Sequence, residues 1–557
     1  MQALTYGERK YLSRKQWDTL RLTGTAHLIA ISGLHISVIS MFTFFVLVKL
    51  ISQSAYLCNI FPAHHYAALG TMLTAFFYAY LAGYSLPTQR ALVMVLTVLV
   101  AAILHKPSLS LNVLAVALLL ILIITPVSVL TVGFWYSFLS VLFIFIALNI
   151  FSNCGKLKKF IFIQLYLSAA LLPLGLLIFK QGALIAPIAN LIAIPLVSFI
   201  ILPINFMAQL LFILELSLAD YCLDLLNSLL SLLVSILTYL ADMQINTIHY
   251  QASLAAVLIY QIGLYLVIQK KGFPGRYLAA ALIAAILLLR EGDVDDHELI
   301  LTVLDVGQGL SVVIETAQHV MVYDTGLSTP SGFSMSNSVI KPYLLYRNIK
   351  QIDRLVISHN DNDHAGGLNQ LLASNRVKQL MLGEYVEHKT HTHFTYCRRQ
   401  QNWVWGQIRF EILHPPLAWQ SDSNNQSCVI KVTHPNASFL LTGDIEQEVE
   451  ALLVTEYGEQ LKSDLLIVPH HGSRTSSSSE FLAKVQPAYA VVSAGIDNRY
   501  GHPHQQVIAR YRDIDTRLLT TASSGAVTFK FDQQGIHLPE AYADATKRYW
   551  HSARNRL

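Results

Sequence analysis

The sequence predicts a polytopic α-helical membrane domain followed by a soluble α/β domain, and two observations support this fold class. First, 53% of the 557 residues are hydrophobic and only 13% are charged, so the chain is too apolar for a soluble protein and too long for one domain. Second, the apolar excess is confined to residues 24–290, where runs such as Leu111–Thr125 and Val129–Phe151 carry almost no charge. Residues 298–535 have the mixed composition of a soluble domain.

The two ends of the chain complete a division into four regions. Within residues 1–23, cations alternate with apolar side chains over Glu8–Arg21, which predicts an amphipathic helix on a membrane surface. Residues 536–557 form a basic, aromatic tail. Such a composition can bind phosphates and stack on bases, although a frayed basic terminus has the same composition.

Basic loops indicate the topology of the membrane domain. Gly155–Lys159 and Gln269–Arg276 carry clustered cations and are expected on the cytoplasmic side. Apolar segments before, between and after these loops add up to about ten spans, which puts the soluble domain in the periplasm or outside the cell. The cations near Arg9 oppose this orientation unless they belong to the surface helix.

Polar residues interrupt the apolar segments of the membrane domain at His27, Ser32, His35 and Arg90. Polar groups at membrane depth need partners and normally face a bundle interior or a water-filled path, so these residues are expected to line a channel. For Arg90, which lies between two apolar stretches, the alternative is a side chain that snorkels from a short loop.

The soluble domain is organised around residues 356–367. An apolar strand ends there in a turn that carries His359, Asp361, Asp363 and His364, and a Gly pair follows. Imidazole and carboxylate together suit Zn²⁺, Mn²⁺ or Fe, and this spacing allows the ligands to surround one ion or two. The turn therefore predicts a divalent metal site.

The order His-x-Asp-x-Asp-His followed by Ala-Gly-Gly resembles the metallo-β-lactamase superfamily, which implies an αββα sandwich and an ion such as Mn or Zn. By this resemblance Asp444 takes the position of the metal-bridging carboxylate, and Asp324 supports the ligand turn from behind. The last ligand is His470 or His471. His470 is favoured as the first side chain beyond the strand, with His471 left open.

The superfamily's usual third-motif histidine is absent from this sequence. Residues 424–427 stand in its place, where Asn425 and Ser427 are expected to support the ligands, and His414 lies too far upstream. This departure leaves open whether one ion or two are bound. His502, in Asn498–Pro503, resembles a further signature near the site and is expected to orient substrate or a ligand.

Together with the segment His27–His35 and the motif Pro87-x-x-Arg90-Ala91, these motifs resemble the ComEC family, the inner-membrane DNA-uptake proteins of natural transformation. The resemblance runs from about residue 3 to about residue 535. It implies a multi-pass protein of the bacterial inner membrane that contacts lipid, single-stranded DNA, a DNA receptor and a cytoplasmic motor. Family members usually carry two membrane helices and an oligonucleotide-binding barrel before this point, and by this resemblance the chain is expected to lack both, as a fragment, through a misplaced start codon or as a shortened form.

These observations lead to a principal functional hypothesis and two alternatives. The first is a channel for single-stranded DNA whose outer domain is a metal-dependent nuclease, with catalysis at Asp361, Asp363, His470, His471 and His502. The alternatives are a membrane-anchored envelope metallo-hydrolase and a DNA channel with a catalytically silent outer domain. No Gly-x-x-x-x-Gly-Lys loop is present, so the chain is expected to bind no nucleotide and a motor would be a partner.

Five cysteines occur, and two of them, Cys397 and Cys428, lie in the soluble domain. A disulfide between them is expected if that domain lies on the oxidising side of the membrane. The alternative is two buried free thiols.

Overall fold

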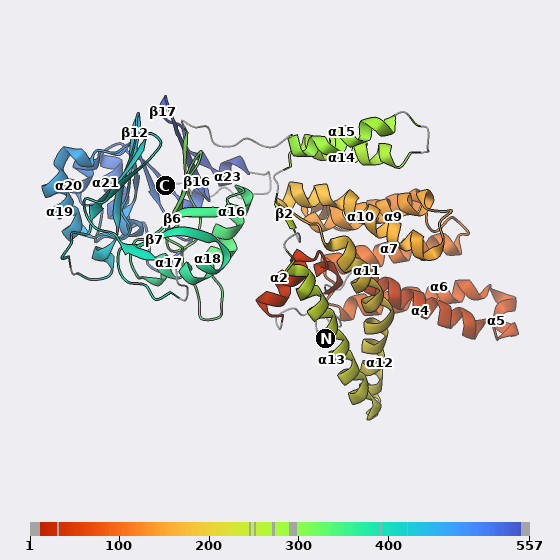
Figure 1. Ribbon diagram of the computed structural model, residues 1–557. Coiled ribbons are helices and arrows are strands. Elements are labelled where there is room, and N and C mark those ends of the chain that lie inside the picture. The colour runs from red at the N-terminus through yellow and green to blue at the C-terminus, as the bar shows by residue number, and fades with distance from the viewer. Residues whose placement is uncertain are drawn as a thin grey trace. The chain divides into compact units, whose positions relative to one another are not determined.

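The computed structural model describes residues 12–29, 33–243, 247–249, 252–269, 273, 275–288, 298–388, 393–419 and 421–546. The chain divides into two compact units, Met1–Glu291 and Gly292–Leu557. Figure 1 shows that the first unit is built of helices and that the second is built of strands flanked by helices.

Six helices in the described part of the first unit are long and apolar enough to cross a membrane, which confirms the predicted polytopic helical domain. They are α4 (Gly33–Ile51), α7 (Leu86–Ile103), α9 (Val132–Ile150), α10 (Lys156–Phe179), the continuous α11–η2–α12 helix (Ala186–Ile213) and α13 (Leu218–Ala241). The remaining helices of at least 14 residues are α6 (Ala63–Leu81), α8 (Leu111–Ile124), α14 (Leu254–Val267) and α15 (Gly275–Leu288).

The number of spans stays a prediction. A helix of 14 residues, such as α8, rises only about 21 Å, whereas the hydrocarbon core of a bilayer is about 30 Å thick. The estimate of about ten spans therefore depends on these shorter helices and on α6, whose first turn contains two histidines.

Short elements complete the first unit. They are α2 (Arg14–Leu22), α3 (Ala26–Ile29), α5 (Ala55–Ile60), η1 (Pro126–Leu130), and the strands β1 (Gln181–Ala183) and β2 (Thr247–His249), which pair. Ser13 and Gln16 form a capping box that starts α2. Leu20 of α2 is buried in a cluster with residues of α11, α12 and α13. Leu20 of the expected surface helix over Glu8–Arg21 thus packs on the helical bundle, and the position of this segment on a membrane surface stays a prediction.

Two mixed sheets form the second unit. The first has the order β17-β16-β3-β4-β5-β6-β7-β8, with β18 paired to β16, and the second has the order β15-β14-β13-β12-β11-β10-β9. The strands of the first are β3 (Leu299–Val303), β4 (Val312–Thr316), β5 (Val320–Tyr323), β6 (Gln351–Ile357), β7 (Arg376–Leu382), β8 (Phe394–Tyr396), β16 (Val527–Asp532), β17 (Gly535–Ile536) and β18 (Glu540–Ala541). Those of the second are β9 (Asn402–Trp405), β10 (Ile408–His414), β11 (Val429–His434), β12 (Ala437–Leu441), β13 (Leu465–Ile467), β14 (Tyr489–Val492) and β15 (Arg517–Thr520).

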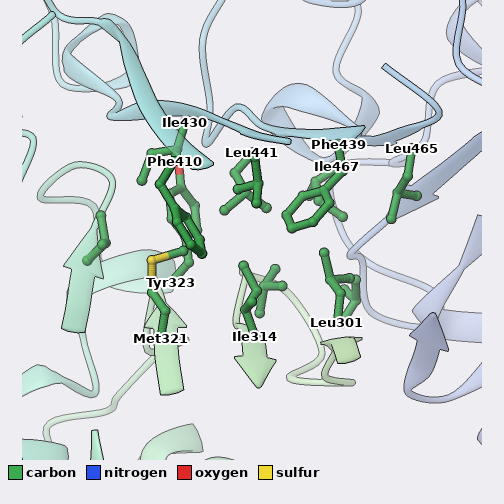
Figure 2. Packing of buried hydrophobic residues seen from close by; sticks show 14 of the residues in the cluster. Leu301, Ile314, Met321, Tyr323, Phe410, Ile430, Phe439, Leu441, Leu465 and Ile467 are labelled. Carbon is green, nitrogen blue, oxygen red and sulfur yellow. The ribbon is translucent and has the colours of Figure 1, made fainter. Parts of the chain in front are cut away.

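The core of this unit lies between the two sheets. Figure 2 shows Ile314 and Tyr323 of the first sheet facing Phe410 and Leu441 of the second. Helices α16 (Lys341–Tyr346) and α18 (Leu368–Ser374) cover the outer face of the first sheet, while α19 (Gln447–Tyr457), α20 (Ser479–Val485) and α21 (Gln505–Asp513) cover that of the second. The resulting αββα sandwich confirms the predicted fold of the soluble domain.

The direction of the strands creates one functional edge. β5 and β6 run parallel in the first sheet, and β12, β13 and β14 run parallel in the second. Because parallel strands end at the same edge of a sheet, the loops that follow them are brought together.

Candidate metal centre and buried polar groups

Candidate metal ligands and one supporting carboxylate, that of Asp324, follow the carboxyl ends of these parallel strands. Asp324 follows β5, His359 follows β6, Asp444 follows β12 and His471 follows β13. His364 lies in α17 (Asn362–Ala365), the short helix that comes next after the end of β6. Residues far apart in the sequence thus converge at the edge where the sheets end.

The structure brings four of these side chains, together with Asp363, into two overlapping groups. One group is His359, His364 and Asp444, and the other is Asp363, His364 and His471. In each group one ligand atom from every residue lies within 4.8 Å of the others. His364 belongs to both, so the groups form one continuous centre.

The geometry of the centre fits a divalent cation. Nδ1 of His364 lies 2.8 Å from Asp324 Oδ2 and Nδ1 of His471 lies 2.8 Å from the Ser493 carbonyl, so in the neutral form that a metal ligand takes, each ring carries its proton on Nδ1. The two Nε2 atoms then present lone pairs to each other at 3.1 Å. Nε2 of His359 and Oδ1 of Asp444 are buried without a hydrogen-bond partner among the described residues. A cation between these atoms would satisfy all of them.

The buried carboxylates and histidines of the centre also favour a bound divalent cation. Burial by itself would raise the pKa of Asp444, but His364 and His471 hold it well below its ordinary value. Burial would lower the pKa of His364, but Asp444 and Asp324 raise it well above its ordinary value. The buried carboxylates therefore require positive charge beside them, which a metal ion supplies when it is bound.

Asp324 lies behind the two ligand groups and contacts His364. This fully buried residue has a φ of 62° and accepts hydrogen bonds from the backbone nitrogen and the hydroxyl of Ser358, at 2.7 and 2.8 Å. With its contact to His364, the carboxylate fixes both the turn and one ligand ring. Ser358 also lies 2.9 Å from Nδ1 of His359, so one serine connects both histidines of the turn.

The residues in place of the third-motif histidine support the centre without entering either group. Ser427 Oγ accepts from the Asp444 backbone nitrogen at 3.0 Å and lies 3.3 Å from His359 Nδ1. Asn425 accepts from the Glu446 backbone nitrogen through Oδ1. His414 lies 2.9 Å from the carbonyl of Asn425 and is not in either group.

Of the two histidines that the sequence leaves open as the last ligand, the structure places His471 in a ligand group and His470 outside both groups. His471 is buried, and its Nε2 lies 3.4 Å from both Asp363 Oδ2 and Asp444 Oδ2. His470 lies outside both groups, with Nδ1 3.3 Å from Glu446 and Nε2 3.9 Å from Asp444. Both histidines have positive φ, so the chain turns between the strand and the site, and the second side chain reaches the centre.

Asp361 and His502 lie at the margin of the centre. Asp361 is half exposed, and its Oδ2 lies 3.7 Å from His359 Nε2. The His502 ring stacks on that of His471, with 6.4 Å between ring centroids. Burial lowers the pKa of His502 to about 4, and its Nδ1 has no hydrogen-bond partner among the described residues.

The supporting roles of Ser358 and Ser493 are absent from the sequence prediction, whereas the tight loop Asp305–Gly309 is expected from the sequence to face the site. A Cβ on Gly309, whose φ is 121°, would lie 2.2 Å from the Asp363 carbonyl oxygen, so only glycine lets this loop reach the ligand turn. The hydroxyl of Ser493 donates to the Gly309 carbonyl. Both serines directly follow apolar strands, which is the only signal that could have identified them.

Cys397 and Cys428 are joined by a disulfide in the second unit, with 5.8 Å between their Cα atoms. Both are buried. The Cys428 backbone nitrogen donates to the Ser358 carbonyl, and its carbonyl accepts from the Tyr323 hydroxyl. The disulfide is therefore attached to the strand that precedes the ligand turn. Cys58, Cys154 and Cys222 are free.

The helical unit buries polar side chains among its apolar helices. The side chains of His35 in α4 and Arg90 in α7 are 0% and 5% exposed. The two helices approach each other beside these residues, because an added Cβ on Gly33 would lie 3.6 Å from Cβ of Ala91. Within the described ranges, buried side-chain atoms without a hydrogen-bond partner include those of Ser40, Thr71, Tyr78, Arg90, Ser128, Asn190 and Ser198. His27 is exposed, and Ser32 lies outside the described residues.

Comparison with known families and proteins agrees with both units. Residues 4–274 match the competence protein family and residues 304–496 match the metallo-beta-lactamase superfamily. The chain is 33% identical to "Competence protein ComA" of Neisseria gonorrhoeae, covering 96% of this chain and 75% of that protein. It is 28% identical to "Recombination protein 2" of Haemophilus influenzae, covering 97% and 72%, and 27% identical to "ComE operon protein 3" of Bacillus subtilis, covering 98% and 74%.

These matches span both units of the chain. The metallo-β-lactamase fold implies divalent metal binding, in agreement with the two ligand groups. The apolar helices together with the competence match make this a multi-pass membrane protein. The chain therefore belongs to the ComEC-type family of competence proteins, with a metallo-β-lactamase domain and a role in DNA uptake in competence.

Proposed function

We propose that the first unit, Met1–Glu291, is a helical unit that conducts single-stranded DNA across the bacterial inner membrane. We propose that the second unit, Gly292–Leu557, is a sandwich unit that acts as a metal-dependent phosphodiesterase and cleaves DNA. The observation that carries the enzymatic part is the sharing of His364 between two ligand groups. Two overlapping groups suit one ion or two. Mn²⁺ and Zn²⁺ are the ions we expect, because the donors are imidazoles and carboxylates.

The ligands in this proposal are His359, Asp363, His364, Asp444 and His471, with Asp361 able to join from the margin. A bound divalent ion supplies charge that polarises a phosphoryl oxygen and makes water more acidic. The protein keeps the rings of His364 and His471 oriented through Asp324 and the Ser493 carbonyl. His502 and His470 lie beside His471, where either ring can accept or donate a proton.

The transport part of the proposal depends on the buried polar groups of the helical unit. An arginine at the centre of a bilayer costs about 2.5–3.5 kcal/mol on insertion scales, so Arg90 is expected to face water or DNA phosphate rather than lipid. The buried hydroxyl groups of Tyr78 and Thr71, which find no hydrogen-bond partner in the described part of the chain, are consistent with a hydrated interior. We expect a DNA receptor and a cytoplasmic motor as separate partner proteins, because the sequence has no phosphate-binding loop.

We place the sandwich unit outside the cytoplasm. The clustered cations of Gly155–Lys159 and Gln269–Arg276 support this orientation. The disulfide between Cys397 and Cys428 also supports it, because disulfides persist in oxidising compartments.

The test uses the purified full chain with end-labelled single- and double-stranded DNA, after removal of metal and addition of Mn²⁺ or Zn²⁺. Metal-dependent cleavage by the wild type, absent in Asp444→Asn, is the expected result. Uptake of labelled DNA by cells that carry the same variants measures transport separately. Equal cleavage by both proteins would contradict the assignment of this centre.

A second candidate, a DNA channel with a catalytically silent sandwich unit, is favoured by Asn425 and Ser427 in place of the third-motif histidine. It predicts that metal binds while DNA remains intact and uptake proceeds. The remaining alternative, a membrane-anchored envelope hydrolase, predicts hydrolysis without any contribution to uptake. The two assays together separate these outcomes.

A further inference from the structure

Three histidines meet in the helical unit, apart from the metal centre. His64 and His65 lie in the first turn of α6, and His105 lies two residues after the end of α7. Their ring centroids are 4.4 to 5.7 Å apart. One ring nitrogen from each lies within 4.8 Å of the others.

The backbone of α7 orients one of these rings. Nε2 of His65 lies 3.2 Å from the carbonyl oxygen of Ile103, so in the neutral ring Nε2 carries the proton and donates to that carbonyl. Nδ1 then has a free lone pair, and this atom is buried without a hydrogen-bond partner among the described residues. A histidine that donates one nitrogen to a backbone carbonyl and offers the other is the usual arrangement of a metal ligand.

We propose that His64, His65 and His105 bind a divalent transition-metal ion. Three imidazoles suit Zn²⁺, Ni²⁺ or Cu²⁺ rather than Mg²⁺ or Ca²⁺, which prefer oxygen. Two nitrogens on one tetrahedral zinc ion lie about 3.4 Å apart, so nitrogens that are within 4.8 Å of one another need to approach by about 1.4 Å at most. The fourth position is left for water.

The ion would connect the start of α6 to the residues just after the end of α7. α6 and α7 are joined at their other ends by residues 82–85, and Arg90 lies in the first turns of α7 after this connection. A metal on His64, His65 and His105 would therefore close the helix pair and hold α7 against α6. This role is structural. It is independent of the phosphodiesterase proposal, because the ligands of the phosphodiesterase metal centre belong to the second unit.

The experiment measures bound metal per chain in the purified, detergent-solubilised full protein after equilibration with Zn²⁺ and removal of free ion. His65→Phe and His105→Phe are each expected to hold one equivalent less than the wild type. His388→Gln changes a histidine outside both this cluster and the metal centre, and should retain all bound metal. The double variant Asp444→Asn/His105→Phe should lose as much bound metal as the two single variants lose together.

A second substitution distinguishes a lost ligand from a disturbed fold. His105→Cys supplies a thiolate, another zinc ligand, and is expected to regain the equivalent that His105→Phe loses. The proposal is overturned if both phenylalanine variants hold as much metal as the wild type. It is also overturned if the loss in His105→Phe is not reversed by His105→Cys.

Discussion

Asp324 Oδ2 lies 2.8 Å from Nδ1 of His364, and neither residue is exposed to solvent. The contact joins the end of β5 to the helix after β6, 40 positions along the chain. The same carboxylate accepts two hydrogen bonds from Ser358. Because the carboxylate orients His364, the ligand that belongs to both groups, its loss should affect every ion in the centre.

Asp324→Asn is therefore expected to weaken metal binding by about 10- to 100-fold, the usual cost of losing such a supporting partner. Metal affinity is measured by competition with a chelator on the full chain. Asp353→Asn is the matched control, because Asp353 also belongs to the first sheet but pairs with Lys378. An unchanged affinity in Asp324→Asn would show that the ring is held by other contacts.

The neighbouring histidines His470 and His471 allow a sharp comparison. His471→Gln removes a ring that faces Asp363 and Asp444, so it should lower the bound metal and abolish hydrolysis. His470→Gln should leave the metal content near that of the wild type, because His470 lies outside both groups. Elemental analysis of the metal content of the two variants shows which histidine is the ligand. A larger loss of metal in His470→Gln than in His471→Gln would support His470, the residue favoured from the sequence.

The disulfide should stabilise the sandwich unit. Cys397 and Cys428 are 31 positions apart, and closing a loop of this length contributes on the order of 3–4 kcal/mol in the chain-entropy model. Reduction should therefore lower the denaturant midpoint of this unit in the wild type and leave the Cys397→Ala/Cys428→Ala variant unchanged. Cys58→Ala is the control, since this cysteine is free and exposed.

Glu450 of α19 gives the stability of the sandwich unit a dependence on pH. Its carboxylate accepts hydrogen bonds from the backbone nitrogens of Ser477 and Ser478, and burial raises its pKa above the ordinary value of 4.5. The folded state therefore favours the protonated acid. This contribution is fully present below the unfolded pKa and is lost as the pH rises through the folded pKa.

Glu450→Gln should remove this dependence, because the amide does not ionise. Unfolding free energy is measured for both proteins from about pH 4.5, the ordinary pKa of the group, upward. The wild type should lose stability relative to the variant as the pH rises. Parallel curves would show that Glu450 has the same pKa in the folded and unfolded states.

Much of the metal centre could be predicted because its ligands follow apolar strands in a fixed order. The turn at residues 359–364 and the position of Asp444 both have this signal. The orientation of His471 could not be predicted, since it depends on two successive left-handed backbone conformations. The hydrogen bonds of Ser358 and Ser493 depend on contacts between sheets, which a local pattern does not contain.

The fold class of the helical unit could be predicted from the sequence. The number of its membrane spans and the packing of α2 could not. Hydropathy identifies the long apolar helices, whereas α8 and α14, with 14 residues each, are too short for composition alone to decide whether they span. The amphipathic pattern of α2 indicates an apolar face but does not say whether lipid or protein covers it. Leu20 is covered by the bundle because α11–α13, far along the chain, pack beside it.

The last prediction concerns Arg90, whose Nε has no hydrogen-bond partner among the described residues. An added Cβ on Gly133 of α9 would lie 3.0 Å from a terminal nitrogen of this guanidinium, so the side chain packs against a neighbouring helix. If Arg90 contacts DNA phosphate, Arg90→Leu should abolish uptake of labelled DNA while the protein still inserts at the wild-type level.

Arg90→Lys keeps the charge but not the planar donor group, and is expected to restore uptake only in part. Lys49→Gln, a change near the end of α4, should have no effect. Insertion is measured by the amount of protein in the membrane fraction, and uptake by protected label. Normal uptake in Arg90→Leu would mean that the arginine serves packing alone, because the charge that the channel proposal requires would then be dispensable.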